Sequence, residues 1–243
     1  MKRILLALSV LLALPLLAQD APPAAPVDPW TSSLGAGVAI TSGNSDTTNI
    51  NLAANTLWDP KTDRLFKADA LYLLGESNGE KQVDKSTANA RYEQLFQERA
   101  FWFGEAQYLR DPFKAINYLI SPLAGAGYHV IKTDTRKLTV DGAVGAVMED
   151  NDLLGRDTSG AVKAGESFEW SISPVSKLTQ KLTGLWKADD FGDALLHFDA
   201  GLSTTVAARL ELKVSYVYDY KTEPPPDIEK GDSALFAALL VKF

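Results

Sequence analysis

Cysteine is absent from the 243 residues, and histidine and methionine each occur only twice. Without cysteine the chain can form no disulfide bond, no thiolate zinc site and no cysteine nucleophile. Basic residues are also few, because 24 Lys and Arg stand against 31 Asp and Glu, and the net charge is −7. Duplex binding needs clustered Lys and Arg that neutralise phosphates, so this charge argues against nucleic acid as a partner.

Long apolar runs are absent after the first 18 residues. Lys2 and Arg3 precede an apolar run over 4–17, which is shorter than the ~20 residues of a membrane-spanning helix. Residues 1–18 therefore predict a secretory signal peptide rather than an anchor helix. Residues 19–30 are rich in Ala and Pro and predict an extended lead-in, and residues 31–243 are expected to form one domain.

The apolar residues of the remaining chain recur with a period of two. In the stretch 209–220, Leu212 and Tyr216 share one face, whereas Glu211 and Lys213 share the other. Successive side chains of a strand point to opposite faces, so this pattern predicts a strand with one apolar and one charged face.

About twelve such segments follow one another, each ~10–14 residues long. That length fits membrane-barrel strands of ~9–11 tilted residues better than soluble strands of ~5–6 residues. Gln94, Glu166 and Gln180 break the pattern, because each falls on an apolar face. The predicted segments are 33–42, 47–58, 64–74, 83–97, 100–110, 118–131, 136–148, 159–171, 175–187, 194–206, 208–220 and 233–243.

The connections between these segments alternate in length, with the longer ones expected at 75–82, 111–117, 149–158, 188–193 and 221–232. Alternating short and long connections are typical of outer-membrane barrels. Since lipid cannot satisfy backbone hydrogen bonds, spanning strands must close into a barrel without edges. We therefore predict an all-β, antiparallel, up-and-down transmembrane β-barrel of about 12 strands, of the outer-membrane type. Outer-membrane lipid is its expected partner, and the final strand ending at Phe243 resembles the segment that the outer-membrane assembly machinery recognises.

The polar faces of the strands are expected to line the lumen, the space enclosed by the barrel. They carry nine basic and nine acidic residues, and balanced charges in a confined space tend to form ion pairs. Twelve strands lie between filled eight-stranded barrels and open porins, so we expect a narrow or partly occluded lumen. The expected lumen-lining residues are Lys67, Asp69, Arg91, Glu93, Glu105, Asp141, Lys163, Glu169, Lys181, Asp199, Arg209, Glu211, Lys213 and Asp219, together with Lys85, Glu149, Lys177 and Lys242.

Two alternative proteins are compatible with the same alternation of apolar and polar residues. A soluble periplasmic, lipocalin-like barrel would turn its apolar face inward around a ligand, but many of those positions are Ala or Gly and would pack poorly as a core. An outer-membrane hydrolase of lipid or peptide would use a histidine at the rim. His197 shares a face with Asp199 and Ser203, whereas His129 has no evident partner. A catalytic triad needs its nucleophile, base and orienting acid in mutual contact.

Motifs for cofactor chemistry are also missing. The sequence holds no Gly-rich phosphate loop, no HExxH and no dinucleotide fingerprint, and the stretch 150–161 departs from the EF-hand pattern at its fifth and twelfth positions. We therefore expect no cofactor, no metal and no catalytic residue.

Three stretches resemble the domain-of-unknown-function 481 family, also described as salt-induced outer-membrane proteins. They are GAGVAITSGNSD at 35–46, the region 101–147 with FWFGEAQYLRDPF, GAGYHV and VDGAVGAV, and the region 218–243 with its Pro-rich loop, Gly231-Asp232 and terminal Phe. The resemblance implies a barrel in the outer membrane of a Gram-negative bacterium and a link to salt response. It supplies no catalytic or binding residues.

Together these observations predict a non-enzymatic role in the bacterial envelope. The leading version is a narrow passive pore for ions or small solutes under osmotic stress, with the hydrolase and the soluble ligand-binding barrel as alternatives. The oligomeric state is left open.

Overall fold

The computed structural model describes residues 28–42, 47–77, 80–152, 155–225 and 227–243. The predicted signal peptide, most of the lead-in and the tip of the SGNSD hairpin lie outside the described residues. Among those that are described, no helix is both long and apolar enough to cross a membrane.

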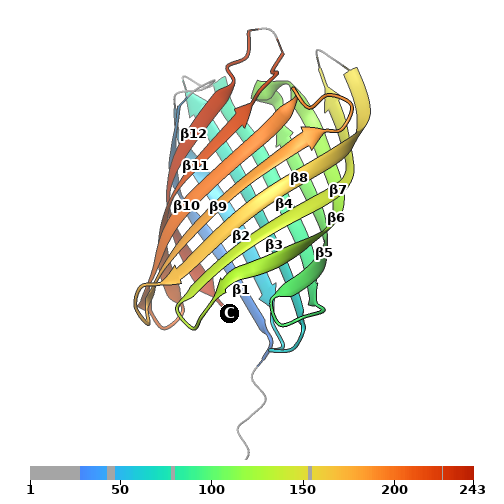
Figure 1. The fold of residues 1–243 in the computed structure, drawn as a ribbon. Coiled ribbons are helices and arrows are strands. Elements are labelled where there is room, and N and C mark those ends of the chain that lie inside the picture. The colour runs from blue at the N-terminus through green and yellow to red at the C-terminus, as the bar shows by residue number, and fades with distance from the viewer. Residues whose placement is uncertain (1–27, 43–46, 78–79, 153–154, 226) are drawn as a thin grey trace, which may run out of the picture.

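Strands that each pair antiparallel with their sequence neighbours form a closed barrel, in which β1 also pairs with β12 (Figure 1). This confirms the predicted fold class. A single-turn 3-10 helix, η1 (Pro112–Lys114), follows β5. Within the described residues the strands number twelve: β1 Trp30–Ser42, β2 Thr47–Trp58, β3 Arg64–Ser77, β4 Glu80–Leu95, β5 Ala100–Asp111, β6 Ile116–Lys132, β7 Arg136–Asn151, β8 Gly155–Ser171, β9 Ser176–Lys187, β10 Ala194–Ala207, β11 Leu210–Lys221 and β12 Gly231–Lys242.

We call the end where β1 begins and β12 ends the terminus end, and the opposite end the loop end. Two of the loops expected at the loop end are mostly strand. The β3–β4 pairing continues to Ser77 opposite Glu80, and the β7–β8 pairing continues to Asn151 opposite Gly155. The apolar alternation stops before these residues, so it marked where a lipid-facing surface would end rather than where backbone pairing ends.

The outer surface of the barrel is apolar. Leu34, Ile50 and Val144 are 57%, 63% and 64% exposed, and their neighbours along each strand turn inward. Such exposure of large apolar side chains would be unfavourable in water, whereas lipid accommodates it. The side-chain alternation therefore contradicts the lipocalin-like alternative, in which these residues would face inward.

The lumen is less polar than predicted. Phe101 and Phe103 of β5 are each 1% exposed and lead an apolar cluster that includes Leu123, and a second cluster surrounds Phe236. Each of these phenylalanines occupies an inward position of its strand, while Trp102 and Leu235 beside them are exposed, so the alternation was preserved but the inward face was not uniformly polar. One part of the lumen is therefore filled by side chains.

The closure between β1 and β12 depends on a glycine. A Cβ atom added at Gly37 would collide with the carbonyl oxygen of Ala237, whereas one added at Gly104 would meet no atom within 4 Å. We expect Gly37→Ala to destabilise the barrel by roughly 1–3 kcal/mol, the cost of overpacking, and Gly104→Ala to have little effect. Heat-modifiable gel mobility reports the folded fraction. Equal folded fractions for the two variants would contradict this account of the closure.

Candidate functional site

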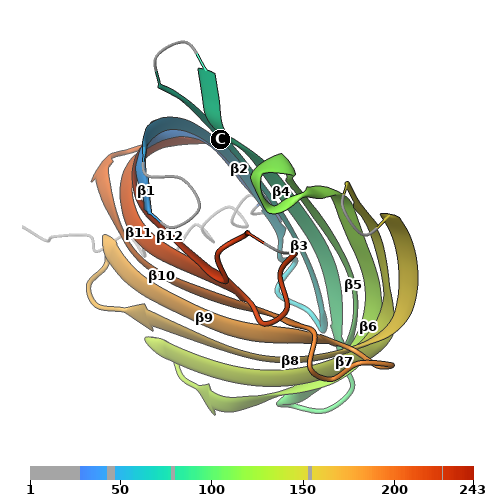
Figure 2. The same ribbon diagram turned by 90° about the horizontal axis from the view of Figure 1, so that it is seen from above.

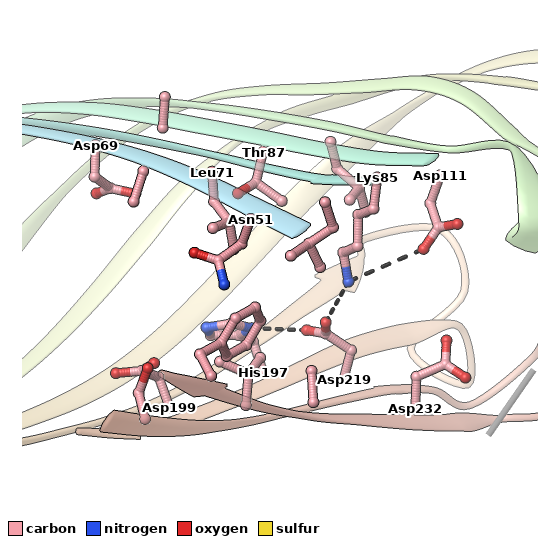
Figure 3. A pocket seen from close by; sticks show the side chains of 18 of the residues that line it. Asn51, Asp69, Leu71, Lys85, Thr87, Asp111, His197, Asp199, Asp219 and Asp232 are labelled. Carbon is pink, nitrogen blue, oxygen red and sulfur yellow. Dashed lines mark hydrogen bonds and ion pairs between the residues drawn. The ribbon is translucent and has the colours of Figure 1, made fainter. Parts of the chain in front are cut away.

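An open cavity of about 390 Å³ occupies one side of the lumen, and residues of β2–β5 and β9–β12 line it. The opposite side, around β6–β8 and the beginning of β5, is filled by side chains. Asp69 on β3 and Asp199 on β10 lie at one end of this cavity (Figure 3). Asn51 of β2 points into it, is 1% exposed and has no hydrogen-bond partner for its Nδ2 atom. The cavity therefore offers polar groups to a solute or to water.

The other end of the cavity carries an ion cluster that crosses the lumen. Lys85 of β4 lies 2.5 Å from Asp219 of β11 and 4.0 Å from Asp111 of β5. Asp219 also lies 2.7 Å from the Nδ1 atom of His197 on β10 (Figure 3). Five steps around the barrel separate β4 from β11, so the Lys85–Asp219 pair joins opposite walls. This cluster narrows the passage.

Two further ion pairs cross the lumen near the loop end. Lys114 of η1 is 4% exposed and lies 2.8 Å from Asp232 of β12. Lys221 of β11 lies 2.9 Å from Glu149 of β7, which also contacts Lys187 at 3.4 Å. Figure 2 shows the β11–β12 connection lying over the same opening. The loop end is therefore the narrower region of the passage.

A buried ion network holds the filled side together. Arg91 of β4 contacts Glu93 and Glu105 at 2.8 Å each and Asp141 at 3.0 Å. Lys163 of β8, 2% exposed, contacts Glu105 at 2.7 Å. The Arg91 guanidinium also lies 3.5 Å from the centre of the Phe103 ring, a cation–π contact. Since these residues come from β4, β5, β7 and β8, the network braces strands that are not neighbours.

The expected lumen residues thus divide into groups. One group lines the open cavity: Asp69, Lys181, Asp199, Lys213 and Asp219, with Lys85. A second group forms the network on the filled side: Lys67, Arg91, Glu93, Glu105, Asp141 and Lys163. A third group pairs near the terminus end: Glu169 with Lys177 and Glu211 with Lys242.

Arg209 does not lie on a strand. It occupies the exposed turn between β10 and β11, because β11 begins at Leu210 rather than at 208. A register shift between Thr205 and Ala207 precedes this turn, and alternation alone cannot locate such an irregularity.

Several interior residues were not predicted from the sequence. Lys114 was expected in an exposed loop, but the short helix η1 turns it into the lumen. His129 has a partner after all, since its Nδ1 atom lies 3.0 Å from the Thr139 hydroxyl and its ring stacks on Phe101 at 4.9 Å. The ring contact joins β5 to β6, and the hydroxyl contact depends on the register of the β6–β7 pairing, which shifts just after His129, so no local pattern marks either contact.

The geometry around His197 does not complete a hydrolase triad. Asp219 contacts the ring as an orienting acid would, but Ser203 lies six residues further along β10 and pairs with Lys213. At ~3.3 Å per strand residue this separation is roughly 20 Å, beyond any proton transfer. Ser203 is therefore too far from His197 to act as the nucleophile that the hydrolase alternative would need beside this histidine.

A family profile described as "Protein of unknown function, DUF481" matches residues 34–243. The chain belongs to the DUF481 family. This agrees with the resemblance of the three sequence stretches. Among curated proteins nothing matches this DUF481 chain.

Solved structures similar to this DUF481 barrel include outer-membrane porins and channels. The NanC porin gives a TM-score of 0.59 at 7% identity, covering 86% of this chain and all of that one. The COG4313 outer membrane channel from Pseudomonas putida F1 gives 0.55 at 14% identity, with coverages of 93% and 100%. The KdgM porin gives 0.53 at 8% identity, with coverages of 87% and 99%. At such identities the likeness concerns the fold.

Proposed function

We propose that this protein is a narrow passive pore for small ions and polar solutes in the outer membrane of a Gram-negative bacterium. The observation that carries the proposal is the cavity of about 390 Å³ along one side of the lumen. The apolar outer face suits lipid, and the similar folds are those of porins and channels.

The charge along the cavity favours weak selectivity. Five aspartates and three lysines line it, and Lys114 neutralises one of the aspartates from the side of η1. Charged rings of one sign produce selective filters, whereas nearly balanced linings do not. The small excess of negative charge should give a slight preference for cations.

Planar bilayers with refolded full-length protein test the proposal. We expect discrete single-channel currents and a K⁺ to Cl⁻ permeability ratio of roughly 1–3, read from the reversal potential in a salt gradient. If bilayers show no current although the protein is folded, as judged by its heat-modifiable mobility, only a structural role would remain. A strong preference for anions would contradict the selectivity that we infer from the lining residues, but it would still support a pore.

The route to the membrane belongs to the same proposal. Residues 1–18 would direct export to the periplasm, and the assembly machinery would insert the barrel through β12 and Phe243. Detergent-dependent extraction of the processed chain from the outer-membrane fraction is the expected result. The link to osmotic stress rests only on the resemblance drawn from the sequence, and growth of a deletion strain at high salt tests it.

A further inference from the structure

A polar pair lies on the outer, apolar face of the barrel. Gln180 of β9 donates a hydrogen bond from Nε2 to the Glu166 carboxylate of β8 at 3.4 Å. Pairing between β8 and β9 is continuous there, with Glu166 opposite Leu182 and Val140 opposite Glu166 on β7. Leu182 and Val140 are 47% and 41% exposed outward, so neither a bulge nor a strand end explains the pair.

The neighbouring residue fixes the orientation of Glu166. A Cβ atom added at Gly165 would lie 2.9 Å from the Asp141 carboxylate, which belongs to the interior network around Arg91. Gly165 therefore faces the lumen, and Glu166, the next residue along β8, faces out.

The pair lies well inside the apolar band. Trp170 marks the headgroup level near the terminus end, as interfacial aromatic residues do, and Arg136 lies 5.0 Å from its ring. Glu166 is four residues further into β8, which at ~3.3 Å per residue and a tilt of ~40° is roughly 10 Å from that level.

A single hydrogen bond leaves this pair incompletely satisfied. Glu166 keeps one carboxylate oxygen, and Gln180 keeps one N–H and its carbonyl oxygen, without a partner among the described residues. Lipid tails offer no hydrogen bonds, so polar groups at this depth gain most from a protein partner. Glu166 and Gln180 form a self-complementary set: a two-fold axis beside them would bring each amide against the carboxylate of the other copy.

We propose that the outer face of β8 and β9 around Glu166 and Gln180 is the interface of a homodimer in the membrane. The inference goes beyond pore function and rests only on the barrel lying in a bilayer. The occupant is a second copy of this chain, because the donor and acceptor complement themselves.

The absence of cysteine makes a crosslinking test clean. Leu182→Cys places one thiol beside the pair, and Leu52→Cys places one on the exposed face of β2, five strand steps away. In vesicles of refolded protein at low protein density, oxidation should yield at least about fivefold more dimer with Leu182→Cys than with Leu52→Cys. Equal yields would overturn the proposal.

Further substitutions at the pair distinguish a loss of the interface from a loss of folding. Adding Glu166→Leu and Gln180→Leu to Leu182→Cys should lower the dimer yield to that of Leu52→Cys, while heat-modifiable mobility shows an intact barrel. Glu166→Gln keeps hydrogen-bonding groups and should retain the dimer. A dimer yield that is unchanged by Glu166→Leu and Gln180→Leu would refute a second copy as the occupant. Crosslinking of Leu182→Cys only to another protein in native membranes would also refute it. Either outcome leaves the pore proposal untouched.

Discussion

Replacing Lys85 by serine is expected to raise the single-channel conductance by about twofold or more and to increase the preference for cations. The Lys85 side chain crosses the lumen to Asp219, so its removal widens the narrowed passage. It also leaves Asp219 and Asp111 without their shared cation. Both effects act at the loop end of the cavity, where His197 is the next contact of Asp219.

A matched control lies on the same strand. Lys81 is 56% exposed in its side chain and pairs with Asp84 at 3.6 Å, away from the lumen. Lys81→Ser removes the same charge and a similar volume, yet it should leave conductance and reversal potential unchanged. If Lys85→Ser conducts as the wild type does, the cavity beside Lys85 is not the conducting path.

Glu105→Ala is expected to destabilise the barrel by roughly 3–5 kcal/mol, as the removal of one member of a buried ion pair does. Glu105 accepts from both Lys163 and Arg91. Its loss leaves the Lys163 ammonium, on a side chain that is 1% exposed, without an ion-pair partner among the described residues. Urea-induced unfolding from lipid vesicles, followed by tryptophan fluorescence, measures the change.

Glu169→Ala serves as the comparison for this prediction. Glu169 pairs with Lys177 at 2.5 Å, but the two side chains are 38% and 46% exposed. Exposed pairs contribute only ~0–1 kcal/mol, so this variant should unfold close to the wild-type midpoint. Similar decreases in the free energy of unfolding for Glu105→Ala and Glu169→Ala would mean that the network around Arg91 is hydrated and does not stabilise the barrel.

The fold was predictable because a period of two survives wherever one face meets lipid and the other does not. Strand number, closure and most inward residues follow from that rule. The ends of β3, β4, β7 and β8 could not be predicted from this rule. Their backbone pairing continues past the edge of the lipid layer, where the strands no longer have an apolar face.

The site was only partly predictable. Charge balance indicated ion pairing, but the partners Lys85 and Asp219 are 134 residues apart, and only barrel closure brings them together. Phe103 on the inward face broke the expectation of a uniformly polar lumen, and Lys114 entered the lumen from a segment that was expected to be an exposed loop. The positions of both side chains depend on which part of the interior is filled, and that is a property of the assembled barrel.

Lipid contact of the outer face and water contact of the lumen are the central claim, and nitroxide labels test it most directly. Single cysteines at Leu212 and Tyr216 would carry labels on the outer face of β11, and those at Glu211 and Lys213 would carry them on the inner face. In vesicles, the first two should be accessible to apolar oxygen and shielded from a water-soluble relaxation agent, with the reverse for the other two. The opposite accessibility pattern would contradict the account.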